Sequence, residues 1–205
     1  MRTTLNTLKI DNEGTLVPVK VTVSVSPGIG VHVVNMKDSG VKEMLLRTIT
    51  AIQDAGYRIP GKKIVISFSE EITTLFSLSD AAVAIALLIA TEQIKPVLKY
   101  DIINISGELR LDGSLKKPSF ICPQYSTCID RVEKHKGLCT GCCFHQWPNE
   151  TTKYNLPDWQ MYMLPAELDE TLFSETDVYS IAQESLRHII STLQTPDPYG
   201  NTKTN

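Results

Sequence analysis

The residues best suited to chemistry are five cysteines that gather between positions 122 and 143. Cys139 and Cys142 form a Cys-x2-Cys turn, which can direct two thiolates at one ion, and zinc prefers four such tetrahedral ligands. The expected ligands are Cys122, Cys128, Cys139 and Cys142, with Cys143 and His145 as alternates. Four protein ligands leave no position open for substrate, so the site would be structural. Because Cys122-x5-Cys128 is wider than the usual spacing, an iron–sulfur cluster and free thiols remain alternatives.

Basic and aromatic side chains lie between and just after these cysteines. The residues are Arg131, Lys134, His135, Lys136, Phe144 and Trp147. Such a combination can contact a nucleic-acid backbone and stack on bases, which predicts a nucleic-acid surface at Arg131, Lys134, Lys136 and Trp147. The alternative is a solvated helix face around a small metal site, and Asp130 and Glu133 favour it by diluting the positive field.

The composition describes a folded protein without a global basic field. The 205 residues are 42% hydrophobic, with a net charge of −3. The N-terminus has no apolar core of signal-peptide length, and no segment predicts a transmembrane helix. We therefore expect a soluble, cytoplasmic protein without membrane partners. Reduced thiols in that compartment favour metal binding over disulfides.

The most apolar stretch, residues 79–90, must lie at the centre of the core. Asp80 is its one charged residue, and the rest are small or aliphatic. A helix that is apolar on all sides is buried, and this one is too short for a bilayer, which needs about 20 residues. We expect Ser79 or Asp80 to cap its N-terminus through a side-chain oxygen.

The remaining chain predicts an α+β fold, with a sheet packed on two to three helices. Strands are expected at 17–25, 30–36, 62–69, 100–106 and 160–164, a hairpin at 107–116, and helices at 39–55 and about 177–193. The strand at 62–69 is apolar on both faces at its middle, which is typical of a covered sheet. The last helix would be capped by Thr176 or Asp177. We expect one domain from residues 1–118 and 160–195, a Cys-rich insertion at 119–159, and a disordered tail at 196–205.

Several strings, in this order, resemble the magnesium-chelatase-like family, which includes competence and branch-migration helicases. They are PGIGVHVV at 27–34, SGVKE at 39–43, AGYRIPGKKIVI at 55–66, DAAVAIAL at 80–87 and SGELRLDG at 106–113. The last two also resemble the Lon-type domain of bacterial recombination proteins and of Lon protease. The resemblance covers residues 3–118 and, more loosely, 161–193. It implies the ribosomal-protein-S5 domain-2-like fold.

The resemblance also implies that the catalytic pair of Lon proteases is absent. Those enzymes place a serine at the start of the central helix and a lysine beyond the hairpin, where the amine helps to deprotonate the hydroxyl. Here Asp80 holds the serine position. Ser79 is one residue away, which turns its side chain by about 100° on a helix. Lys116 and Lys117 lie short of the lysine position.

The segment Gly56 to Lys63 comes close to a phosphate-binding loop but fails in three ways. Lys63 replaces the final Ser or Thr, Pro60 removes a backbone N–H, and the turn leaves a helix instead of entering one. No other segment resembles such a loop, so we expect no ATP site and no AAA+ module in this chain.

The expected function is a non-catalytic binding or assembly module. Its partner would be DNA or a protein, such as a separately encoded AAA+ ATPase, and a homo-oligomer is compatible with the sequence. The alternative is an enzyme: a relict serine peptidase using Ser79 with Lys116 or Lys117, or a thiol-dependent activity at the cysteines.

Overall fold

The computed structural model describes residues 1–10, 16–72, 78–97, 103–116, 161–165 and 180–196. These residues form a seven-stranded mixed sheet, a separate two-stranded hairpin and three helices. The strands are β1 (Arg2–Ile10), β2 (Leu16–Ser26), β3 (Gly30–Met36), β4 (Lys63–Ile72), β5 (Ile103–Ile105), β6 (Glu108–Leu109), β7 (Leu115–Lys116), β8 (Met161–Pro165) and β9 (Ser180–Gln183). The helices are α1 (Asp38–Asp54), α2 (Asp80–Ala90) and α5 (Leu186–Gln194). The α+β class predicted from the sequence is confirmed.

The sheet has the order β3-β4-β2-β1-β5-β8-β9. Strand β2 pairs antiparallel with both β1 and β4, so it lies inside the sheet. Its valines at positions 19, 21, 23 and 25 are buried on one face, while Lys20, Thr22 and Ser24 alternate on the other. This period of two places the polar side chains on the face away from the core.

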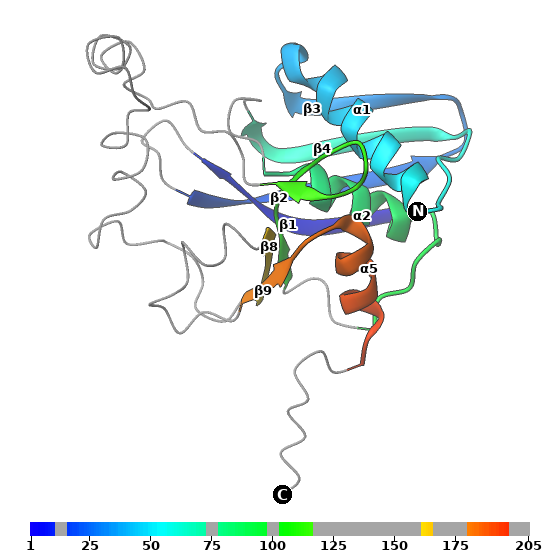
Figure 1. The fold of residues 1–205 in the computed structure, drawn as a ribbon. Helices are drawn as coiled ribbons and strands as arrows, with labels where there is room; N and C mark the ends of the chain where they lie inside the picture. Colours follow the sequence, from blue (N-terminus) through cyan, green and yellow to red (C-terminus); the bar gives the residue numbers. More distant parts are fainter. Residues whose placement is uncertain (11–15, 73–77, 98–102, 117–160, 166–179, 197–205) are drawn as a thin grey trace, which may run out of the picture.

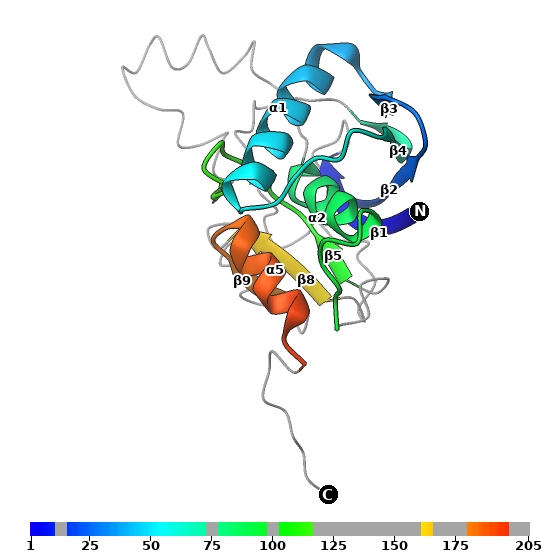
Figure 2. The same cartoon turned by 90° about the vertical axis from the view of Figure 1, so that its right-hand side faces the viewer.

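Helix α2 is the centre of the core, as predicted. Every residue from Asp80 to Ala90 is buried, and the helix packs against β1, β2 and α1. Figures 1 and 2 show α1, α2 and α5 on the same side of the sheet. Ser79 is the N-cap residue but makes no side-chain capping hydrogen bond, so the predicted cap is wrong in that respect. No helix in the described residues is long and apolar enough to cross a membrane.

Strand β4 departs from its prediction. Ile64, Ile66 and Phe68 are buried, but Val65 and Ser67 are only half-buried and the next residues are exposed. The strand is therefore covered by helices on one face alone.

The last predicted helix is also wrong over its first part. Residues 180–183 form β9, which pairs in parallel with β8, Tyr162 opposite Ser180. Pairing with the open edge of β8 outweighs the helical spacing of Ile181 and Ala182 with later apolar residues. The helix begins only at Leu186, capped by Ser185, whose hydroxyl accepts a hydrogen bond from the His188 N–H. The predicted caps at Thr176 and Asp177 lie outside the described residues, as do the whole 119–159 insertion and residues 197–205 of the tail.

Candidate functional site

Asp80 lies at the start of α2 with none of its surface exposed to solvent. Its Oδ2 accepts a hydrogen bond from Arg47 Nε at 2.7 Å and a longer one from the Leu109 backbone N–H at 3.3 Å. Its Oδ1 is buried and has no hydrogen-bond partner among the described residues. Among the described residues, the carboxylate is therefore held through one oxygen only.

Three elements meet around this carboxylate. Helix α1 supplies Arg47, and the hairpin of β6 and β7 supplies the Leu109 N–H. The hairpin is fixed to α2 by backbone hydrogen bonds, because Gly107 N–H donates to the Leu78 carbonyl at 2.7 Å and Ala81 N–H donates to the Gly107 carbonyl at 3.1 Å. The position of Asp80 thus depends on all three elements.

Arg47 connects the buried carboxylate to a chain of charges that reaches the surface. Its side chain is 23% exposed, and its guanidinium lies 3.7 Å from Glu43 and 3.7 Å from Glu108. Glu108 also pairs with the ammonium of Lys116 at 2.9 Å. Negative and positive side chains therefore alternate from Asp80 towards the surface. Each of these charged side chains has a partner of opposite charge.

Burial raises the pKa of Asp80 to about 6. Removal from water disfavours the ionised form. The Arg47 hydrogen bond and charge, together with the Leu109 N–H, oppose this effect, while the nearby Glu108 carboxylate adds to it. Near neutral pH the group is thus largely ionised, with Arg47 as its counter-ion.

Of the other residues predicted for a peptidase, Ser79 and Lys116 lie in the part of the chain that the structure describes. Ser79 is fully buried. The ammonium of Lys116 is held by Glu108. Lys117 lies outside the described residues. An attacking hydroxyl needs access to substrate and a base within hydrogen-bond reach, and burial of Ser79 denies it the first of these.

The predicted zinc ligands and nucleic-acid residues cannot be compared with the structure. Cys122, Cys128, Cys139, Cys142, Cys143 and His145 lie outside the described residues, as do Arg131, Lys134, Lys136 and Trp147. Within the part of the chain that the structure describes, no group of three His, Cys, Asp or Glu side chains could hold a metal ion.

Arg47 and Glu108 were not predicted from the sequence as members of this site. A signal for Arg47 was present, because it stands beside Met44 and Thr48 on the apolar stripe of α1. A buried carboxylate that stays ionised needs a cation beside it, and Arg47 is the cation that pairs with Asp80.

The comparisons with known proteins agree with this fold. The family described as subunit ChlI of Mg-chelatase matches residues 19–137, which is more than half of the chain, and the chain belongs to this family. The matched range begins in β2 and includes Asp80, Arg47 and the hairpin.

Two curated relatives are also similar to this chain. It is 37% identical over 101 residues to the uncharacterized protein YifB of Escherichia coli, and 33% identical over 101 residues to its namesake in Salmonella typhimurium. Each match covers 48% of this chain and 20% of the relative. The matched region is thus about a fifth of the relatives' length.

Proposed function

We propose that this chain is a non-catalytic binding or assembly module of the magnesium-chelatase-like family, with the ribosomal-protein-S5 domain-2-like fold. It acts with DNA or with a separately encoded AAA+ ATPase. One observation carries the proposal: the residue at the start of the central helix is a buried carboxylate paired with an arginine.

The chemistry of this position supports the proposal. An ionised carboxylate is a poor nucleophile for peptide cleavage, and Asp80 is also closed off from substrate by its complete burial. Its only polar contacts in the described residues are with Arg47 and the hairpin backbone. A group held in this way supports structure, because it ties α1, α2 and the hairpin together. Ser79, which precedes Asp80 in the chain, is buried to the same extent.

We also propose that the cysteines at 122, 128, 139 and 142 hold a structural zinc ion. The support comes from their number and spacing in the sequence. On this proposal the metal orders the 119–159 insertion and takes no part in a reaction.

The test of the proposed function is a hydrolysis assay on the full chain. The substrates are unfolded casein and a general fluorogenic peptide, and the proteins are the wild type, Ser79→Ala and Cys142→Ser. We expect no hydrolysis above that of buffer with any of them. Hydrolysis by the wild type that Ser79→Ala abolishes would establish a serine peptidase, and hydrolysis abolished only by Cys142→Ser would establish a thiol enzyme. Either result would overturn the proposal.

A further inference from the structure

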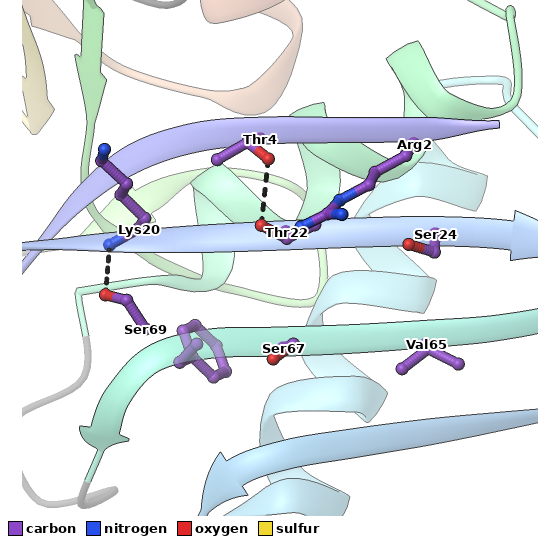
Figure 3. A pocket seen from close by; sticks show the side chains of 9 residues that line it. Arg2, Thr4, Lys20, Thr22, Ser24, Val65, Ser67 and Ser69 are labelled. Carbon is purple, nitrogen blue, oxygen red and sulfur yellow. Dashed lines mark hydrogen bonds between the residues drawn. The ribbon is translucent and has the colours of Figure 1, made fainter.

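The face of the sheet opposite the helices carries a groove with a volume of about 390 Å³ (Figure 3). In this view α1 and α2 lie behind the strands, and the labelled side chains project from β1, β2 and β4 towards the viewer. The groove is lined mainly by Ser and Thr hydroxyls and by two cations. Those used below are Arg2, Thr4, Lys20, Thr22 and Ser67.

The charge of the groove is uniformly positive. Its nine lining residues include Arg2 and Lys20 and no carboxylate. Both cations are exposed, and neither forms an ion pair with another described residue. Lys63 extends the same face, because it is exposed, opposes Ser26 of β2 and alternates along β4 with buried Ile64. This surface is therefore an exception on a chain whose net charge is −3.

The hydroxyls form a polar floor between the cations. Thr4 and Thr22 oppose each other on β1 and β2, and their hydroxyl oxygens lie 3.0 Å apart. Thr22 in turn opposes Ser67 of β4, so the three side chains form a row across three strands. Hydroxyls and cations of this kind are the common donors to phosphate oxygens.

The position of the groove inside the sheet favours single-stranded over double-stranded nucleic acid. Its strands β4, β2 and β1 lie inside the sheet, with β3 on one side and β5 on the other. The major groove of a duplex, about 12 Å wide, admits a helix or a two-stranded ribbon. Neighbouring strands are about 4.8 Å apart, so a sheet of seven strands is too broad to enter the major groove of a duplex. A single strand can lie along the open face.

We propose that this groove binds the sugar–phosphate backbone of single-stranded nucleic acid, with Arg2 and Lys20 as its phosphate contacts. The inference rests on the proposed function and names the partner of the binding module. The one aromatic lining residue, Phe68, is 1% exposed and offers no surface for stacking. Stacking is worth about 1–3 kcal/mol per base, so binding without it is weak, tolerant of sequence and strongly dependent on salt.

The test measures fluorescence anisotropy of labelled oligothymidylate and oligouridylate with the full chain over a series of salt concentrations. For a single strand, each phosphate contact contributes about 0.7 to the slope of log K against log salt. The double variant Arg2→Ala/Lys20→Ala should weaken binding about tenfold or more and reduce this slope by about 1.4. Circular dichroism establishes that the variants are folded.

Two control variants make the assignment specific. Lys42→Ala/Arg110→Ala removes the same charge from exposed positions on α1 and in the hairpin turn, and should leave affinity within about twofold. Lys134→Ala/Lys136→Ala tests the basic residues of the insertion. The proposal is overturned if neither oligonucleotide binds, if the control loses as much affinity as the groove variant, if only the insertion variant loses affinity, or if a duplex binds as tightly as the single strand. None of these outcomes involves hydrolysis, so the proposed function is tested separately.

Discussion

The Nε of Arg47 and the Oδ2 of Asp80 lie 2.7 Å apart across the interface between α1 and α2. The carboxylate is fully buried, and the guanidinium extends from it towards Glu43 and Glu108 near the surface. This pair explains how a charged residue is accommodated in a helix that is otherwise apolar. Burial of the carboxylate, which Arg47 only partly offsets, makes the stability of the domain dependent on pH.

The first prediction concerns the pH dependence of the free energy of unfolding. Asp80 binds its proton up to a pKa of about 6 in the folded state, whereas an unfolded Asp loses it near 3.9. Between these pH values the folded state binds more protons than the unfolded state. The stability that protonated Asp80 contributes is therefore lost as pH rises from about 4 to 6, and it does not change further above pH 6. The difference between the two pKa values corresponds to roughly 3 kcal/mol in the free energy of unfolding. Urea denaturation across this pH range measures it.

Asp80→Asn should remove this pH dependence and raise the free energy of unfolding at pH 7 by up to about 3 kcal/mol, because a neutral amide avoids the cost of burying a charge and can still accept a hydrogen bond from Arg47. Asp54→Asn is the matched control, since its carboxylate is 47% exposed and pairs with Arg187 at the surface. A slope between pH 4 and 6 that persists in Asp80→Asn would show that another group causes it.

The second prediction concerns Arg47→Met. The substitution leaves an ionised carboxylate buried without its counter-ion, which should lower the free energy of unfolding by about 3 kcal/mol at pH 7. The loss should be smaller at pH 5, where Asp80 is mostly protonated. In the double variant with Asp80→Asn, the loss caused by Arg47→Met should be much smaller than in the wild type.

The control for this prediction is Arg187→Met, which breaks an exposed pair with Asp54 and should change stability by less than about 1 kcal/mol. Equal losses for Arg47→Met with and without Asp80→Asn would mean that Arg47 acts by packing alone.

The third prediction tests the close packing around Gly107, whose backbone joins the hairpin to the start of α2. A Cβ at Gly107 would lie 2.8 Å from Leu115 Cδ2 and 3.1 Å from the Pro165 ring. The tip of Leu115 can shift but the proline ring cannot, so Gly107→Ala should cost about 1–3 kcal/mol. Gly61→Ala, with no atom within 4 Å of its added methyl group, should be nearly neutral. If the two variants were equally stable in urea, Gly107 would not be a point of close packing.

The fourth prediction concerns metal content. Plasma mass spectrometry of protein purified without added metal should find about one zinc per chain, and Cys139→Ser/Cys142→Ser should lose it. Chelation should then expose the segment between positions 118 and 159 to protease. A visible absorbance band would indicate an iron–sulfur cluster in place of zinc. Five freely titrating thiols without metal would contradict both.

Much of the fold could be predicted because its signals are local. The alternating valines of β2 reflect the burial of one face of a single strand, and the apolar run of α2 reflects the burial of a single helix. Strand β1 was missed because its apolar residues do not alternate: Leu5 and Leu8 are both fully buried although they project from opposite faces. Strand β9 was predicted as helix because its pairing with β8 is a contact between distant parts of the chain.

The candidate site was predictable only in part for the same reason. Asp80 stood out as the one charge in an apolar helix, but its partners come from α1 and the hairpin, 33 residues before and 29 residues after it. The groove on the open face of the sheet was even less predictable from the sequence, because its side chains come from β1, β2 and β4, which are far apart in the chain.

The most direct test of the central claim, that the start of α2 carries no catalytic nucleophile, is the intact mass of the full chain after incubation with a serine-directed fluorophosphonate. We predict an unmodified mass for both the wild type and the Ser79→Ala variant. A stoichiometric adduct that maps to Ser79 and is absent from Ser79→Ala would contradict it, because only an accessible and activated hydroxyl reacts in this way.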